Sequence, residues 1–288
     1  TQGVSSAASD VYKRQGLYCR KHATDVNGFV LGGRSVGPWL TAFAYGTSYF
    51  SAVVFVGYAG QFGWKYGIAA TWAGIGNAII GSLLAWVVLG RRTRIMSQHL
   101  DSATMPQFFG KRFGSNPLKI GASVIIFIFL IPYTASLYNG LSRLFGMAFN
   151  IDYSVCIIIM ATLTAIYVIA GGYMATAIND FIQGIIMLFG IIAVIAAVIH
   201  SKGGFMSALQ GLANVSDPVV SDTPGIFASF FGPDPFNLLC VVILTSLGTW
   251  GLPQMVQKFY AIDNEASIQK GTVTVSYTHL TLPTILLV

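Results

Sequence analysis

The spacing of charged residues is the feature of this sequence that most limits how the chain can fold. Six stretches without Asp, Glu, Lys or Arg each cover 21 to 30 residues. A membrane-spanning helix needs about 20 mostly apolar residues. The stretches are apolar all round rather than along one face, which favours spanning helices over helices lying on a membrane surface. We predict an all-α integral membrane fold with transmembrane helices over about 37–62, 66–89, 118–147, 153–171, 176–200 and 236–257.

Composition excludes several other classes of protein. The chain is 54% hydrophobic and only 9% charged, whereas soluble domains carry roughly 25% charged residues. A soluble reading would require polar helices to cover the apolar ones, and the sequence offers none. The net charge of +6 is spread thinly, unlike the dense basic face of a nucleic-acid-binding protein. We therefore expect the lipid bilayer as a partner, and no nucleic acid.

The distribution of Lys and Arg predicts the orientation, because short cytoplasmic loops carry an excess of these residues. If the segment 16–36 is cytoplasmic, alternation across six spans places eleven basic residues on that side and three on the other. The cytoplasmic set is Arg20, Lys21, Arg34, Arg91, Arg92, Arg94, Lys111, Arg112, Lys119, Lys258 and Lys270, and the opposite set is Lys65, Arg143 and Lys202. Segments 16–36 and 258–274 are thus predicted to be cytoplasmic, and the loop 202–235 external.

The two ends depart from this pattern. Residues 1–15 (TQGVSSAASDVYKRQ) lack the charged and apolar regions of a signal peptide. Residues 275–288 (VSYTHLTLPTILLV) form a polar, β-rich run where another helix is due. Both resemble translated adapter sequence, so we expect two non-native tails and a natural chain that continues beyond them. Ordinary disordered termini are the alternative.

Catalytic patterns are missing from the sequence. Its four His residues are scattered, its three Cys residues suggest neither a disulfide nor a metal site, and it has no GxxxxGK phosphate loop. We expect that the protein is not an enzyme and has no organic cofactor.

The middle of the first span reads YGTSYFS over residues 45–51. A glycine followed by hydroxyl residues at this depth suggests a broken helix, which is tolerated only in contact with protein or a cavity. Exposed carbonyls and hydroxyl oxygens of such a break can bind Na⁺, although small residues also mark close helix packing. Candidate pathway residues here are Ser48, Tyr49 and Ser51.

Asp180 is the one acidic residue inside the predicted spans, and Gln183 shares its helix face. An intramembrane carboxylate indicates a cation ligand or a proton carrier. The alternative is an N-terminal helix cap, since Asp180 follows the expected turn at Gly171-Gly172 by a few residues. Pro253 in the last span is expected to kink or break that helix. Tyr133, beside Pro132, either lines a cavity or donates to a neighbouring carbonyl.

Three segments together resemble the sodium:solute symporter family, which includes Na⁺/proline, Na⁺/pantothenate and Na⁺/glucose carriers. They read FVLGGRSVGPWLTAFAYGTSYFSAVVFVG, YVIAGGYMATAINDFIQGIIMLFG and GLPQMVQKFYA, and the likeness is collinear from about residue 16 to about 274. The resemblance implies an inverted-repeat (LeuT-like) transporter core of two five-helix repeats. This chain would supply the first repeat plus the first helix of the second.

The resemblance also implies a mechanism and a site. The function would be Na⁺-coupled symport of a small organic solute by alternating access, in the inner (plasma) membrane of a bacterium, with Na⁺ as coupling ion. The backbone carbonyls of Thr47 and Phe50 match half of the family's Na⁺ site, and Tyr133 matches a cavity tyrosine. A channel-like or sensory membrane protein on the same scaffold is the alternative.

Two departures bear on the solute. Tyr49 stands where the proline carriers have Asp, and Val53 stands where they have Trp. These weaken a proline assignment, and the segments TSYFS and NDFIQGIIMLFG look closer to the pantothenate branch. The solute class stays open among carboxylates, amino acids and pantothenate-like compounds.

Overall fold

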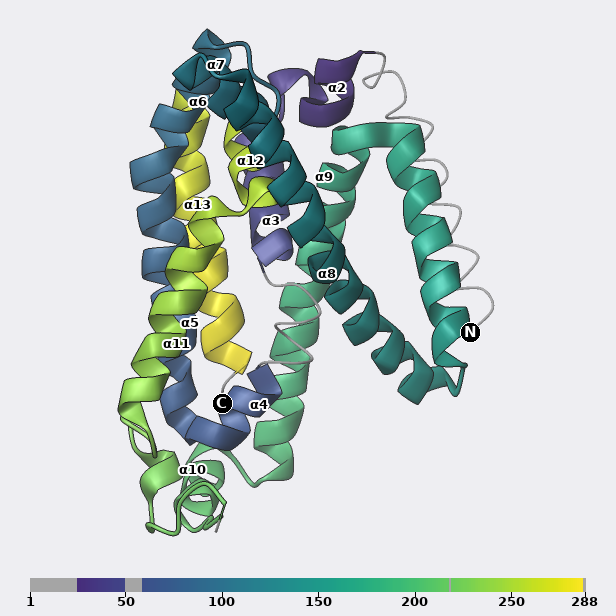
Figure 1. The fold of residues 1–288 in the computed structure, drawn as a ribbon. Coiled ribbons are helices and arrows are strands. Elements are labelled where there is room, and N and C mark those ends of the chain that lie inside the picture. Colours follow the sequence, from purple (N-terminus) through teal and green to yellow (C-terminus); the bar gives the residue numbers. More distant parts are fainter. Residues whose placement is uncertain (1–24, 50–58, 218, 287–288) are drawn as a thin grey trace.

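The computed structural model describes residues 25–49, 59–217 and 219–286, and helices dominate these ranges (Figure 1). No strand is assigned in them, and only two isolated β-bridges occur. The first half contains α2 (Val26–Leu31), η2 (Gly32–Arg34), α3 (Pro38–Tyr49), α4 (Ala59–Tyr66), η4 (Gly67–Ala70), α5 (Thr71–Gly76), η5 (Asn77–Leu84), η6 (Trp86–Gly90), α6 (Arg91–His99), α7 (Met105–Phe113) and α8 (Asn116–Phe149). The second half contains α9 (Tyr153–Ser201), α10 (Phe205–Ala213), η7 (Ile226–Ala228), α11 (Pro235–Gly248), η8 (Thr249–Gly251), α12 (Pro253–Ala261) and α13 (Glu265–Leu286).

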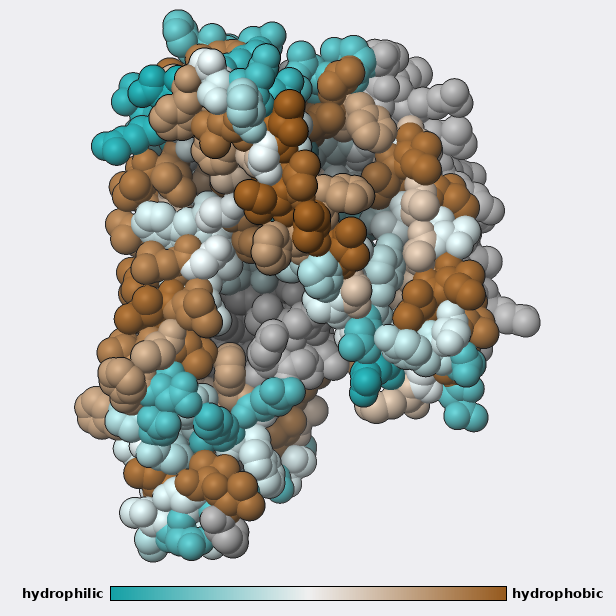
Figure 2. Space-filling model, viewed as in Figure 1, coloured by the Kyte–Doolittle hydropathy of each residue, from teal (hydrophilic) through white to brown (hydrophobic). Residues whose placement is uncertain are grey.

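Three helical stretches in the described residues are long and apolar enough to cross a membrane, and a bent pair adds a fourth. The three are Gly60–His99, Asn116–Phe149 and Tyr153–Ser201. Their apolar side chains form brown bands between hydrophilic ends in Figure 2. In α8 none of the most apolar 18-residue window is buried inside the protein. A lipid environment removes the cost of exposing such a surface, as expected for a membrane protein.

The long helix α9 contains two of the predicted spans. Its backbone turns at Gly172, where φ is 55° and ψ is −150°. Figure 1 shows α9 as two diverging limbs. Only glycine adopts such a conformation without strain. A Cβ at this position would also lie 2.7 Å from the carbonyl oxygen of Phe29. The predicted spans 153–171 and 176–200 are therefore joined by a glycine turn without an intervening loop.

The second predicted span, 66–89, extends further than expected. The helical path continues through Arg91 to His99. Arg94 is buried there and donates to the backbone carbonyls of Ile262 and Asp263 at 2.6 and 3.0 Å. Arginine is a good helix former, so charge alone does not end a helix when the guanidinium finds acceptors.

A second arginine binds at the same end of the helices. Arg34 has a positive φ of 55°, which is unfavourable for a residue with a side chain. Its guanidinium donates to the carbonyls of Ser102, Ser97 and Tyr260 at 2.8, 3.3 and 3.3 Å. Burial, and secondly the nearby Arg94, lower the pKa of Arg34. We call Arg34 and Arg94 the arginine clamp, because together they tie the ends of α6 and α12 to η2.

The C-terminal region differs from the prediction. Instead of a β-rich run from residue 275, the chain forms the helix α13 from Glu265 to Leu286. Val275 is fully buried, and a Cβ on Gly271 would lie 2.6 Å from the ring of Trp86. The Thr- and Val-rich composition that suggested a strand is overridden by this packing, because intrinsic propensity is weaker than tertiary contacts.

An aromatic cluster holds the inner helices together. The ring of Trp86 lies 5.5 Å from that of Tyr45 and 5.2 Å from that of Phe259, edge-on in both cases. Edge-to-face pairs of this kind stabilise by about 0.5–1.5 kcal/mol beyond their area burial. The cluster joins α3, η6 and α12, and so fixes the position of α3 at the centre of the fold.

Candidate functional site: a polar cavity and a buried ion pair

A cavity of about 740 Å³ lies between α3, α7, α8 and α12. We call it the polar cavity, because hydroxyl and amide groups interrupt its mostly apolar wall. Its polar lining residues are Thr47, Ser48, Thr104, Ser123, Tyr133, Thr134, Gln254, Gln257 and Tyr260. No Asp, Glu, Lys, Arg or His is among the described residues that line it. The cavity is within the range of volumes that bind small molecules.

The break between α11 and α12 forms one wall of the polar cavity. The two helices bend by 52° at this break. Leu252 is extended, with φ −69° and ψ 127°, and Pro253 begins α12. Proline is favoured at the first turn of a helix, where its missing N–H has no partner to lose. The predicted break at Pro253 is confirmed.

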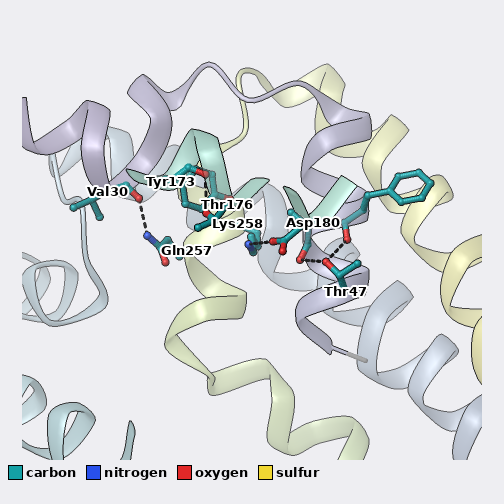
Figure 3. A network of polar contacts seen from close by, with 9 residues as sticks. Val30, Thr47, Tyr173, Thr176, Asp180, Gln257 and Lys258 are labelled. Carbon is teal, nitrogen blue, oxygen red and sulfur yellow. Dashed lines mark hydrogen bonds and ion pairs between the residues drawn. The ribbon is translucent and has the colours of Figure 1, made fainter. Parts of the chain in front are cut away.

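Asp180 and Lys258 form an ion pair beside this wall (Figure 3). Lys258 Nζ lies 3.6 Å from Asp180 Oδ2, and the side chains are 7% and 22% exposed respectively. The same ammonium lies 5.1 Å from the ring centroid of Tyr173. Asp180 is on the second limb of α9, more than two turns beyond Gly172. It is thus a partner of Lys258 and not an N-terminal cap of that limb.

Lys258, which the charge distribution assigns to the cytoplasmic side, is buried within α12. Its neighbour Gln257 donates to the carbonyl of Val30 at 2.6 Å, which ties α12 to α2. The sequence carries a signal for this arrangement, since Lys258 is the one charged residue in the segment GLPQMVQKFYA and is followed by two aromatic residues. An isolated charge in such surroundings needs a partner of opposite sign.

The C-terminal part of α3 packs directly on α9. At Gly184 a Cβ would lie 2.6 Å from Phe43 Cδ1 and 3.2 Å from Thr47 Cγ2. Thr47 donates from its hydroxyl to the carbonyl of Phe43 at 2.9 Å, within its own helix (Figure 3). The α-helix continues through Gly46 to Tyr49. The part of the predicted break in the described residues is therefore helical, while Phe50 and Ser51 lie outside those residues.

Tyr49 is not among the described residues that line the polar cavity, and its hydroxyl belongs to a second polar group. Its hydroxyl lies 2.5 Å from Asn77 Oδ1 and 3.2 Å from the carbonyl of Thr245. Ser246 donates to the same oxygen of Asn77, and Thr249 donates to the Tyr49 hydroxyl. Asn77 begins η5, a π-helical segment of the kind often found at functional sites. The network joins α3, η5 and α11 and occupies the Tyr49 hydroxyl.

The predicted site residues thus lie in three different parts of the structure and on the exposed surface of α9. Thr47, Ser48 and Tyr133 meet at the polar cavity, Asp180 lies in the ion pair, and Tyr49 lies in the Asn77 network. Gln183 is exposed on α9.

The sequence did not single out Lys258, Asn77 and Gln254 as site residues. Of these, Asn77 could have been noticed as an amide within a predicted span. The described residues contain no group of three or more His, Cys, Asp or Glu residues suited to a metal ion. Backbone and hydroxyl oxygens remain suitable for Na⁺.

Spanning helices, a broken helix and a solute-sized cavity together define a polytopic membrane protein of transporter type. The model of the sodium:solute symporter family matches residues 29–287. The chain belongs to this family.

Among similar proteins, the osmoregulated proline transporter OpuE of Bacillus subtilis is 32% identical over 251 residues, covering 86% of this chain and 49% of the relative. The sodium/proline symporter of Staphylococcus aureus is 30% identical over 270 residues, covering 89% of this chain and 49% of the relative. The chain spans about half the length of the curated relatives it matches.

Proposed function

We propose that the transporter containing this chain couples the entry of Na⁺ to the uptake of a small organic solute by alternating access. The observation that carries this proposal is the polar cavity beside a broken helix, in a chain of the sodium:solute symporter family. Half-helices meeting at a solute site are the arrangement expected for alternating access. The chain would form the first inverted repeat and open the second, in the inner membrane of a bacterium.

We place the Na⁺ site near the C-terminal part of α3. Its proposed ligands are the backbone carbonyls of Thr47 and Phe50, with Asp180 as a nearby negative charge. The close packing of Thr47 on Gly184 supports this location, because it brings α3 against the limb of α9 that carries Asp180. In the conformation described, Lys258 neutralises Asp180. Na⁺ and the Lys258 ammonium would therefore compete for the same carboxylate.

The driving force follows from the charge of the ion. Moving one elementary charge through 100 mV yields about 2.3 kcal/mol. A low cytoplasmic Na⁺ concentration would add to this, favouring release of ion and solute inward. The predicted orientation, with the arginine clamp at the cytoplasmic end, fits such inward release.

For the solute, the relatives named as proline transporters favour an amino or imino acid such as proline. Tyr49 and Val53 weaken a proline assignment by sequence, but the Tyr49 hydroxyl is bonded to Asn77 and Tyr49 is not among the described residues that line the polar cavity, while Val53 lies outside the described residues. A difference at Tyr49 therefore need not change what the cavity accepts. Pantothenate, the other solute that the sequence resemblance suggests, is tested beside proline.

The test is solute counterflow by the full-length transporter in proteoliposomes. Labelled L-proline should accumulate in vesicles preloaded with unlabelled L-proline, and an inward Na⁺ gradient should drive net uptake that K⁺ does not support. Labelled pantothenate serves as the parallel substrate. A channel-like or sensory protein would give no uphill, Na⁺-dependent accumulation of either compound, and that result would contradict the proposal.

A further inference from the structure

Asn77 is an amide at the start of η5 that bonds to two other helices inside the membrane-spanning part of the protein. Its Oδ1 accepts from the hydroxyl of Tyr49 in α3 at 2.5 Å and from that of Ser246 in α11 at 3.2 Å. Its Nδ2 donates to the hydroxyl of Thr245 in α11 at 3.3 Å. Polar side chains at such depth are expensive, so a network of this kind calls for a function.

The two ends of this network lie beside the two proposed sites. Tyr49 stands between Thr47 and Phe50, whose backbone carbonyls we propose as Na⁺ ligands. Thr249 lies in η8, at the break between α11 and α12 that forms one wall of the polar cavity. Its hydroxyl donates to the Tyr49 hydroxyl at 3.3 Å. The network therefore connects the end of α3 near the proposed ion site to the helix break beside the solute cavity.

The segment η5 contacts the break a second time. Trp250, next to Thr249 in η8, donates from its indole N–H to the backbone carbonyl of Ile80 at 3.0 Å. Close approach of the helices is possible because Gly81 has no side chain, and a Cβ there would clash with the hydroxyl of Tyr49. Together these contacts fix the break, η5 and the end of α3 relative to one another in the conformation described.

The hydrogen bonds of the network differ in how readily they can be given up. Thr245 and Thr249 also donate to carbonyls of their own helical turn, each at 2.9 Å. A hydroxyl group has only one proton to donate. Both threonines therefore stay paired within their helix when α11 and η8 move away from η5. The bond of 2.5 Å between Tyr49 and Asn77 does not involve α11 and can persist through that movement.

We propose that Asn77 is a positioning residue that transmits the effect of bound Na⁺ to the solute cavity. It holds the end of α3 through Tyr49, and it holds the helix break through the hydroxyl groups of α11 and η8. Na⁺ that fixes the end of α3 thereby favours the arrangement of the break that binds solute. Asn77 is not among the described residues that line the cavity, so its effect on the solute is indirect. This inference rests on the proposed function and names residues that couple its two sites.

The experiment uses the full-length transporter in proteoliposomes, with labelled L-proline and labelled pantothenate as probes. The half-saturating concentration of each probe is measured at low Na⁺ and at saturating Na⁺, with K⁺ as the replacement. We call the first value divided by the second the coupling ratio. Because coupling between two binding sites is reciprocal, the ratio measures how strongly Na⁺ improves solute binding.

Two variants interrupt the network at neighbouring points. Asn77→Leu removes both hydrogen-bonding functions of the amide and keeps a side chain of similar size. Tyr49→Phe removes only the hydroxyl group that bonds to Asn77. Tyr153→Phe is the matched control, because it removes a hydroxyl that bonds to Asn139 at 3.2 Å on the exposed side of α8 and α9. All variants are compared at equal membrane abundance.

Asn77→Leu and Tyr49→Phe should each lower the coupling ratio by about threefold, since single hydrogen bonds between helices in a membrane contribute modestly. The double variant should show no further reduction, because both substitutions interrupt the same connection. The half-saturating concentration at low Na⁺ should stay close to that of the wild type. Tyr153→Phe should keep the wild-type ratio.

Several results would overturn the role of Asn77 while leaving Na⁺-coupled symport intact. These are a wild-type coupling ratio of one, an unchanged ratio in Tyr49→Phe, and additive losses in the double variant. Reduced membrane abundance with an unchanged ratio would likewise assign the network to stability alone. If the wild type shows no Na⁺-dependent accumulation of either probe, the proposed function fails, and this inference with it. Should Asn77→Leu be absent from the membrane, Thr249→Val replaces it, since that change removes the link to Tyr49 from the other end.

Discussion

The ammonium group of Lys258 lies 3.6 Å from Oδ2 of Asp180, and only 7% and 22% of the two side chains is exposed. The pair connects α12 to the second limb of α9 across the interior of the protein (Figure 3). Removing either charge leaves the other uncompensated in a medium of low dielectric constant, which costs more than the pair itself contributes.

The first prediction follows from this coupling. Lys258→Met and Asp180→Asn should each destabilise the full-length transporter by about 3–5 kcal/mol, whereas the double variant should be close to wild type. Thermal unfolding of the purified protein measures the three effects. The exposed pair Arg91–Glu265 is the control, and Glu265→Gln should change stability by less than about 1 kcal/mol. Additive losses in the double variant would show that the two charges are not coupled.

The second prediction concerns Na⁺. If Asp180 attracts the coupling ion, Asp180→Asn should raise the Na⁺ concentration for half-maximal uptake, since the charge is lost and most of the shape is kept. Lys258→Met should lower that concentration, because the competing cation is removed. Na⁺-dependent uptake at normalised membrane abundance measures both. Asp152→Asn, which keeps the exposed cap of α9, should have no effect. An unaltered Na⁺ dependence in both variants would assign Asp180 and Lys258 a structural role alone.

The third prediction uses the contact between α3 and α9. Gly184→Ala places a Cβ 2.6 Å from the ring of Phe43 and 3.2 Å from Thr47 Cγ2, so these side chains or the α3 backbone must move. We expect the Na⁺ requirement of uptake to increase, with a loss of stability of about 1–3 kcal/mol from overpacking. Gly190→Ala on the same limb is the matched control, because a Cβ there meets nothing within 4 Å. Equal behaviour of the two variants would argue against a Na⁺ site that depends on the position of α3.

The fourth prediction concerns the turn in α9. Gly172→Ala combines an unfavourable φ of 55° with a Cβ only 2.7 Å from the carbonyl of Phe29. Strain of this kind costs of order 1–3 kcal/mol before the steric clash is counted. The variant should therefore reach the membrane in reduced amount, as measured by immunoblotting of membrane fractions. Gly121→Ala, with open space around it, should be present at wild-type level.

Local signals in the sequence were sufficient for part of this structure. The charge-free stretches predicted where α8 and the two limbs of α9 lie, because a long apolar run has few alternatives to a spanning helix. The helix break was predictable at Pro253, since proline acts on its own backbone. Neither inference requires knowledge of distant residues.

The remaining features depend on contacts between distant segments. The path that brings Lys258 to Asp180, and the partner that turns Tyr49 towards Asn77, are set by how the helices pack. For the same reason Thr- and Val-rich sequence near Val275 forms a helix against Trp86 instead of a strand. Spacing along the sequence did not indicate that Lys258 lies in a helix with its charge compensated inside the protein.

The arginine clamp has a consequence for the order in which the protein matures during synthesis. Arg34 donates to the carbonyl of Tyr260, which is 226 residues further along the chain. At a synthesis rate of about 5–20 residues per second, the ribosome needs roughly 10–45 seconds to make that acceptor. During this interval Arg34 is free of the contact that helps to hold its unfavourable backbone conformation. The arginine clamp is thus completed only when α12 has been translated, and a chain that ends before Tyr260 would lack this acceptor.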